Sequence, residues 1–309
     1  MTDRQPQTAD DAPRRRFRPG RRTFLAAGLA ATFGVTTYAA NVQNRASADE
    51  GNLDDDIDTA TTNHDAFTSN TALYASTKYA QVRDWDVRFR RHGVSDDNLS
   101  GTVPFPQFVI LAPHGGGIER GTSEICLALA GYRPDTLKPR GGPVFDYWMF
   151  EGLREDGNDR LHVTSSHCDD PVACSLVGGM RHAVSLHGCT AEQAKAKGRT
   201  GQAVVVGGGD KELRDAAVKK LDKAGFEVIA GTTVPALAGL DPRNIVNRTL
   251  TDGGLQLELT TELREAMFKP KKMSRSERPS NTTEVFERFV AAVRDAMQVY
   301  GPIPTPAAY

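Results

Sequence analysis

The sequence predicts one α/β domain in which helices cover a β-sheet. From about residue 79 onward, short apolar runs alternate with segments of helical spacing, which is typical of a sheet with covered faces. The chain has 309 residues, of which 39% are hydrophobic and 25% charged, so it can bury a sizeable core. No internal repeat divides it. We therefore expect a single domain over residues 76–309.

Five apolar runs have the length and composition of strands. They cover residues 108–111, 161–163, 183–186, 203–206 and 255–259. Three other segments have helical spacing, at 122–130, 211–224 and 283–299. The last of these carries apolar Val285, Phe289, Val290, Val293 and Met297.

The first 48 residues resemble an export signal. Arg21 and Arg22 precede an apolar stretch at 24–40, and small residues follow at 46–48, as in a twin-arginine signal. The alternative is a membrane helix, but the stretch contains Gly and Thr and is shorter than the roughly 20 strongly apolar residues of a span. We expect a secreted protein that meets the membrane only through an uncleaved signal. Cleavage after Ala48 stays open.

Residues 49–75 are expected to form a disordered linker. They include the acidic run 54–56 and many Thr, Asn, Ser and Ala residues, but few large apolar ones. Neither a helical nor a strand period is present. The folded domain is therefore expected to begin near residue 76.

The charge balance argues against nucleic-acid binding. Residues 1–48 hold eight Lys and Arg against three Asp and Glu, which leaves 30 against 36 in the rest of the chain. The mature part is thus mildly acidic, near −6, whereas nucleic-acid binders present basic surfaces.

For the oligomeric state, we expect a monomer.

The four cysteines do not predict a thiolate zinc site, because no two of them have CxxC spacing. Twin-arginine substrates fold in a reducing compartment before export, which disfavours a disulfide framework. One disulfide formed after export remains an alternative. The cysteines are Cys126, Cys168, Cys174 and Cys189.

A glycine-rich turn after the strand at 108–111 carries the strongest chemical signal. His114 and Glu119 flank three glycines, and sites in α/β sheets form at the carboxyl ends of strands. Imidazole and carboxylate ligands suit zinc. A third ligand must come from elsewhere, and His187 directly follows the strand at 183–186. The alternatives are ordinary hydrogen-bonded histidines and a phosphate-binding loop, but neither the Walker nor the dinucleotide motif fits.

Five motifs, in the same order, resemble the poly-gamma-glutamate hydrolase family of bacilli and their phages. They are HGGGIERGTSE at 114–124, GNDRLHVTSSHCDDP at 157–171, AVSLHG at 183–188, NIVNR at 244–248 and LQLE at 255–258. The resemblance extends over about residues 76–300. It implies a zinc carboxypeptidase-like fold with a mixed sheet flanked by helices. It also implies zinc on His114, Glu119 and His187, and cleavage of γ-glutamyl amide bonds.

Glu258 is the candidate general base. Three protein ligands leave a fourth zinc position for water, whose pKa falls toward about 7. A carboxylate must then take the proton and pass it to the leaving amine. Glu258 lies in an apolar alternating strand, where a charge facing the core is costly without a purpose. The alternative is that Gln256, Glu258 and Thr260 form the solvent face of an edge strand.

An anionic substrate requires cations and hydrogen-bond donors. Arg160 and Arg248 lie in matched motifs and offer the guanidinium fork that suits carboxylates, with Asn247 as a further donor. His162 and His167 lie five residues apart, so in a strand they point to opposite faces and one can reach the site. A structural, hydrogen-bonded role is the alternative for both histidines.

A basic run near the carboxyl terminus offers a place for a polyanion. A solvated loop is the alternative explanation of the run. Its cations are Lys269, Lys271, Lys272, Arg275 and Arg278.

Two rival functions remain open after the resemblance. The same zinc site could cleave the γ-glutamyl amide of a peptidoglycan stem peptide. A non-catalytic module that binds a cell-wall polymer could also keep the fold, although the presence of both ligand motifs and Glu258 speaks against it.

Overall fold

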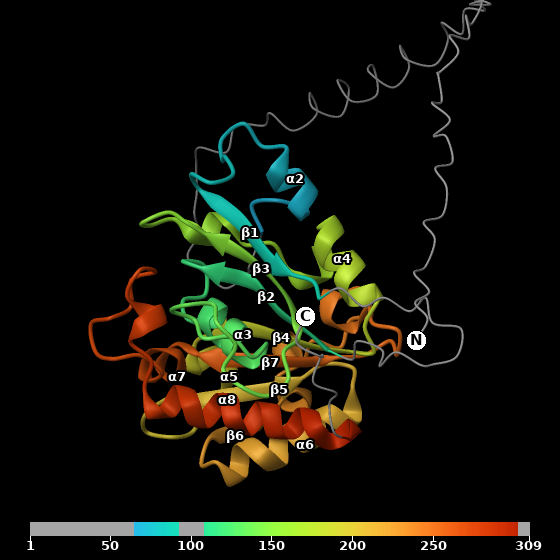
Figure 1. Ribbon diagram of the computed structural model, residues 1–309, viewed down its shortest axis with the longest axis vertical. Coiled ribbons are helices and arrows are strands. Elements are labelled where there is room, and N and C mark those ends of the chain that lie inside the picture. The colour runs from blue at the N-terminus through green and yellow to red at the C-terminus, as the bar shows by residue number, and fades with distance from the viewer. Residues whose placement is uncertain (1–64, 93–107, 302–309) are drawn as a thin grey trace, which may run out of the picture. The chain divides into compact units, whose positions relative to one another are not determined.

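A computed structural model describes residues 65–92 and 108–301, which form a mixed seven-stranded sheet between helices (Figure 1). The strand order is β1-β3-β2-β4-β7-β5-β6. Strands β3, β2, β4 and β7 are parallel, while β1 and β5 run antiparallel to β3 and β7. This confirms the predicted α/β fold. The strands are β1 Trp85–Arg90, β2 Phe108–Gly116, β3 Asp146–Gly152, β4 His182–Cys189, β5 Ala203–Gly207, β6 Glu227–Ala230 and β7 Leu255–Thr260.

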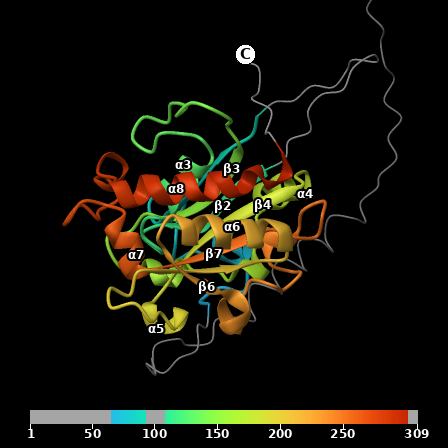
Figure 2. The same cartoon turned by 90° about the horizontal axis from the view of Figure 1, so that it is seen from below.

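Helices cover both faces of the sheet (Figure 2). The face covered by α3, α6 and α8, here called the α8 face, receives Phe108 and Ile110 of β2. The opposite α4 face, covered by α2 and α4, receives Val109 and Leu111. This alternation follows from the two-residue period of a strand. The helices are α2 Asn70–Tyr74, α3 Thr122–Leu129, α4 Pro171–Gly178, α5 Ala191–Ala194, α6 Lys211–Lys223, α7 Thr261–Ala266 and α8 Glu284–Met297.

The chain order creates a crevice at the carboxyl end of β2. From β2 the chain crosses through α3 to β3 on one side, and from β3 it crosses through α4 to β4 on the other side. Crossovers of one hand that move in opposite directions place their helices on opposite faces. The connections after the neighbouring strands β2 and β3 therefore leave toward opposite faces, and open α/β sheets bind ligands where neighbouring connections separate in this way.

The folded domain begins before the predicted boundary at residue 76. Ser69 caps α2 by accepting a hydrogen bond from the amide of Ala72, and Leu73 is fully buried in the α4-face core. The few apolar residues of this segment suffice because they pack on a surface formed by distant parts of the chain. The export signal predicted over 1–48 and the linker residues 49–64 lie outside the described residues.

The strand predicted over 161–163 is wrong. A 3-10 turn occupies Asn158–Leu161, and a second covers Ser165–His167. Leu161 and Val163 are buried against the α4 face, so the apolar pattern that predicted a strand reflects burial without a strand partner.

Within the described ranges, no helix combines the length and apolar character needed to cross a bilayer.

All four cysteines carry free thiols.

Candidate metal centre

A bulge in β2 aims His114 toward the α4 face. Ala112 pairs with Met149 and Gly115 pairs with Glu151, so two residues of β2 oppose one residue of β3. Without the bulge, alternation from Ala112 on the α8 face would place His114 on that same face. The extra residue reverses the alternation, as bulges beside active sites often do.

His187 and Glu258 point to the same α4 face from neighbouring parallel strands. They are register partners in the pairing of β4 with β7, and the residues on either side of them, such as Leu186 and Leu257, pack on the α8 face. Register partners in a sheet have side chains on the same face. Strand register therefore places Glu258 beside His187.

Glu119 reaches the centre from the glycine turn after β2. Gly116 has φ +65°, and a Cβ there would lie 2.3 Å from the carbonyl oxygen of Gly152, so the turn requires glycine. Glu119 accepts a hydrogen bond from the amide of Gly188 at 2.7 Å, and its other oxygen lies 3.0 Å from Nδ1 of His114. This bond joins the β2 turn to the end of β4.

The two predicted histidine ligands present nitrogens to one point. Nδ1 of His114 lies 3.1 Å from Nδ1 of His187, which in turn lies 4.0 Å from the nearer oxygen of Glu119. Two nitrogens bound tetrahedrally to zinc at roughly 2.0–2.1 Å would be about 3.3 Å apart. The spacing fits a shared ion.

Hydrogen bonds fix which ring nitrogens are free. Nε2 of His114 donates to the carbonyl oxygen of Val163 at 2.9 Å, and because a carbonyl only accepts, the lone pair of the neutral ring is on Nδ1. Nε2 of His187 lies 2.8 Å from the hydroxyl of Ser185 and 3.3 Å from that of Ser165, and either can accept its proton. Metal-binding histidines are held in this way.

The charges at the centre favour a cation. Burial raises the pKa of Glu119, but His114, together with His187 and His162, outweighs burial and holds that pKa at about 2. Burial and the charge of His114 lower the pKa of His187 to about 3, so its ring is neutral and can bind a metal. Burial lowers the pKa of His114, yet Glu119 raises it above the ordinary value. The carboxylate of Glu119 thus provides negative charge that a bound cation would neutralise.

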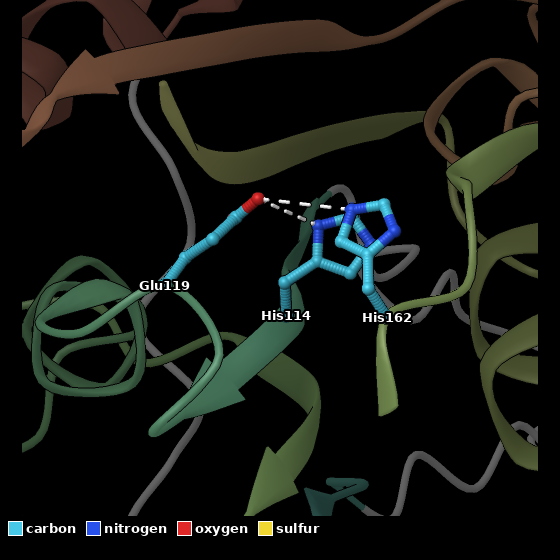
Figure 3. A group of neighbouring side chains, drawn as sticks. All are labelled: His114, Glu119 and His162. Carbon is cyan, nitrogen blue, oxygen red and sulfur yellow. Dashed lines mark hydrogen bonds and ion pairs between the residues drawn. The ribbon is translucent and has the colours of Figure 1, made fainter. Parts of the chain in front are cut away.

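A third histidine, His162 (Figure 3), and an unpredicted aspartate, Asp65, complete the centre. Nε2 of His162 lies 3.9 Å from Glu119, so His114, Glu119 and His162 also form a group that could hold a metal. Asp65 accepts hydrogen bonds from Nδ1 of His162 at 2.7 Å and from the amide of Thr164 at 2.6 Å. The sequence placed Asp65 in a linker. The apolar residues that follow it were the only available sign that it belongs to the fold.

Ring orientation separates the two candidate ligand sets. Lone pairs of imidazole nitrogens lie in the ring plane. The rings of His114 and His162 are tilted against each other, with centroids 3.9 Å apart and planes inclined by 31°, so one ring lies over the other and their lone pairs do not readily meet. The rings of His114 and His187 meet edge to face at 66°, with their Nδ1 atoms 3.1 Å apart. Geometry therefore favours His187 as the ligand.

Glu258 lines the cavity above this centre. The cavity has a volume of about 270 Å³, and its wall also includes Gln256. Burial raises the pKa of Glu258 well above its ordinary value, and the charge of Glu119 raises it further. Nε2 of Gln256 donates to Glu258 at 2.9 Å, and its amide oxygen accepts from Asn244 at 2.7 Å, so the carboxyl is held in place.

The side chain of Asn247 makes four hydrogen bonds, all with backbone groups. Its amide nitrogen donates to the carbonyls of Gly239 and Asp241 at 2.8 and 2.9 Å, and its oxygen accepts from the amides of Gly209 and Gly254 at 2.9 and 3.3 Å. Gly239 and Asp241 line the cavity. Asn247, predicted to bind substrate, thus supports the cavity wall from behind.

Replacing Asn247 by Ala is expected to lower the free energy of unfolding by about 2 kcal/mol, because one buried and three partly buried backbone groups lose a partner. Urea denaturation measures the loss. Asn281→Ala, which removes one hydrogen bond to the carbonyl of Glu277, should cost less. An Asn247→Ala protein of unchanged stability but higher KM would instead indicate direct contact with substrate.

The structure brings the other predicted substrate residues to different places. Arg248 donates to the carbonyls of Cys168, Ser166 and Arg243 and so ties the histidine-bearing segment to the loop before β7. Arg160 is exposed and His167 is half exposed, 3.7 Å from Asp65. Arg160, His167 and Arg248 are absent from the described lining of the cavity, whereas His162 is part of it.

Arg264 is a further buried residue that the sequence did not reveal. Its guanidinium donates to the carbonyls of Arg120 at 3.0 Å and Leu259 at 3.2 Å, joining the turn that carries Glu119 to the end of β7. A Cβ on Gly188 would lie 2.6 Å from Cζ of Arg264. Glycine at position 188 is what lets this cation pack against β4.

Comparison with known families identifies a hydrolase relationship. The model of the poly-gamma-glutamate hydrolase family matches residues 102–292. In Bacillus subtilis (strain 168), UPF0714 protein YndL is 31% identical over 229 residues, covering 72% of this chain and 82% of YndL. SPbeta prophage-derived UPF0714 protein YoqZ is 34% identical over 196 residues, covering 63% of this chain and 64% of YoqZ.

Two solved structures share the fold. A bacteriophage poly-gamma-glutamate hydrolase matches with a TM-score of 0.62 and 30% identity, over 77% of this chain and 98% of its own. A structure described as YNDL-apo (Zinc-free) matches with a TM-score of 0.61 and 28% identity, over 76% of this chain and 98% of its own.

Proposed function

This chain belongs to the poly-gamma-glutamate hydrolase family, and from that premise we propose that it is a zinc-dependent hydrolase of γ-glutamyl amide bonds. The observation that carries the proposal is the convergence of His114, Glu119 and His187 beside Glu258. The description of the YndL structure as zinc-free is consistent with a zinc site in this family.

The residues at the centre fit zinc. Two neutral-ring nitrogens and one carboxylate are the donors that zinc accepts, and Nε2 of each ring is occupied by a hydrogen-bond partner. His114, Glu119 and His187 would hold the ion. When bound, zinc supplies Lewis acidity, which acidifies water and polarises a carbonyl.

Glu258 is proposed to move the proton. As a carboxylate facing the cavity, it accepts a proton from the attacking water and delivers it to the leaving amide nitrogen. Its raised pKa makes it a stronger base and brings proton transfer closer to neutral pH. Gln256 keeps the carboxyl turned toward the cavity through its hydrogen bond.

His162 is proposed to contact the substrate beside the ligands. Because Asp65 accepts from Nδ1, the lone pair of Nε2 faces the cavity, where it can accept a hydrogen bond from substrate. Asp65 is thus a positioning residue for His162.

Replacing Asp65 by Asn is expected to reduce kcat/KM roughly tenfold or more, because a hydrogen bond to a charged group is worth about 1.5–3 kcal/mol and about 1.4 kcal/mol corresponds to a factor of ten. Zinc content should be unchanged, as measured by metal analysis. Asp169→Asn is the matched control, because Asp169 likewise accepts a hydrogen bond from one backbone amide, that of Thr71 in α2. Equal activity of the two variants would rule out the positioning role.

A polymer comparison separates the candidate substrates. Zinc-loaded protein would be incubated with poly-γ-glutamate, α-linked polyglutamate and purified peptidoglycan while chain length and new amines are followed. We expect shortening of the γ-linked polymer alone. Release from peptidoglycan would favour the stem-peptide alternative, and no cleavage with zinc bound would favour a binding module.

Export is proposed from the twin-arginine pattern at Arg21 and Arg22. The Arg21→Lys/Arg22→Lys protein should remain in the cell while the unaltered protein reaches the medium. Equal secretion of both would contradict this route.

A further inference from the structure

The cavity above the candidate metal centre lacks cations for a polyanionic substrate. Its described lining contains the carboxyl groups of Glu119, Asp241 and Glu258 but no Lys or Arg. A γ-linked glutamate polymer carries one free carboxylate on every residue. The parts of such a chain beyond the cleaved bond therefore need a positive surface elsewhere.

A larger hollow on the other side of the Glu119 turn is rich in cations. It has a volume of about 910 Å³ and continues into a second hollow of about 390 Å³, with which it shares Gly117, Arg120, Asn158 and Met273. We call the larger hollow the basic groove, because the smaller one is also lined by Asp156, Asp159 and Glu265. The wall of the basic groove combines the segment after β3 with the segment between α7 and α8, both on the left of Figure 1. The cations that line it are Arg88, Arg120, Arg154, Lys271, Arg275 and Arg278.

Some of these cations are already neutralised. Arg278 pairs with buried Glu124 at 3.0 Å, and Arg88 pairs with buried Glu151 at 3.3 Å. Arg154 pairs with Asp84, which lies outside the groove lining. These pairs hold the walls of the groove together and leave little charge for a ligand.

Three exposed cations have no carboxylate partner among the described residues. They are Arg120, Lys271 and Arg275. Of the acidic side chains in the larger hollow, Glu277 is engaged by Lys272 at 2.7 Å, so Glu155 alone opposes them. The unpaired charge of this hollow is therefore positive, although the chain beyond residue 48 is acidic.

The basic groove adjoins the metal centre through a thin wall. Arg120 directly follows Glu119, and its carbonyl accepts from Arg264. The guanidinium of Arg264 packs against Gly188, which lines the cavity of the metal centre. A chain leaving that cavity has only this wall to cross before it meets Arg120.

We propose that the basic groove binds carboxylates of the polymer beyond the cleaved bond, with Arg120, Lys271 and Arg275 as the binding cations. This rests on the proposed function, because it assigns a second contact region to the same substrate. Such a region would make the enzyme prefer long anionic chains over short ones.

Binding to a non-cleaving protein tests the proposal without relying on turnover. Labelled poly-γ-glutamate would be titrated into zinc-loaded Glu258→Gln protein with and without Lys271→Glu/Arg275→Glu, at low ionic strength, and followed by fluorescence anisotropy. We expect affinity to fall roughly tenfold or more and the difference to shrink with added salt. The matched control is Lys219→Glu/Lys223→Glu on exposed positions of α6, which changes charge equally and should alter binding little.

Kinetics on the otherwise unaltered enzyme provide the second readout. The groove variant should raise KM for long poly-γ-glutamate roughly tenfold and leave kcat and KM for a short γ-glutamyl oligomer unchanged. Equal binding by the groove and control variants would overturn the proposal. Absence of cleavage by the unaltered protein would instead overturn the proposed function, with the binding result still deciding the role of the groove.

Discussion

Replacing Glu258 by Gln is expected to lower kcat roughly 10²-fold to 10⁴-fold, because the neutral amide cannot accept the proton of the attacking water. The amide has nearly the same shape and can keep a hydrogen bond to Gln256, so the cavity should be preserved. Zinc content, measured by metal analysis, should stay at the level of the unaltered protein. Turnover near the original rate would show that another group is the base.

The same substitution should stabilise the metal-free protein. The pKa of Glu258 is raised in the folded state by burial and by Glu119, so ionising it costs folding free energy. The folded state then binds more protons than the unfolded state, and stability from this group is lost as pH rises. The gain from Glu258→Gln should therefore be absent below the ordinary value of 4.5 and grow above it. Urea denaturation at several pH values measures the trend, and a constant difference would contradict it.

Replacing His187 by Ala is expected to weaken zinc binding by more than the roughly 100-fold that loss of a supporting residue costs, because a ligand itself is removed. Chelator competition measures the affinity. His162→Ala should retain zinc far better, since the ring of His162 lies tilted over that of His114, whereas Nδ1 of His187 lies 3.1 Å from Nδ1 of His114.

The outcome that contradicts this assignment is specific. If zinc is held by His114, Glu119 and His162 instead, His162→Ala will lose the metal and His187→Ala will keep it. His167→Ala serves as the control, because His167 is half exposed and is not among the described residues that line the cavity. Its zinc affinity should equal that of the unaltered protein.

Local sequence patterns predicted several parts of the candidate site. The strands around His187 and Glu258 were predicted from short apolar runs, and in the structure alternation along these strands turns both side chains away from the α8 face. Their direct pairing depends on which strands become neighbours. That choice is made by packing of distant segments and could not be obtained from spacing.

The face of the sheet to which His114 points could not be predicted from the sequence pattern. Its facing depends on a bulge opposite β3, and nothing in the run before it distinguishes a bulged strand from a regular one. Asp65 was also missed, because its role depends on a hydrogen bond with His162, which lies 97 residues further along the chain.

The assignments of Asn247 and Arg248 illustrate a different limit. Both side chains bind backbone carbonyls in irregular segments, where those carbonyls have no strand or helix partner. The sequence shows that these side chains can donate hydrogen bonds, but it does not show which carbonyl oxygens accept them. A polar residue in a family motif can therefore support the site without touching the substrate.

The most direct test of the account is a zinc titration of metal-free protein with poly-γ-glutamate cleavage measured at each step. The account predicts that the metal-free chain is inactive and that activity rises linearly to a plateau at one zinc per chain. It also predicts that His187→Ala shows no such plateau at the same zinc concentrations. Full activity of the metal-free protein, or a zinc-saturated protein that leaves the polymer intact, would contradict it.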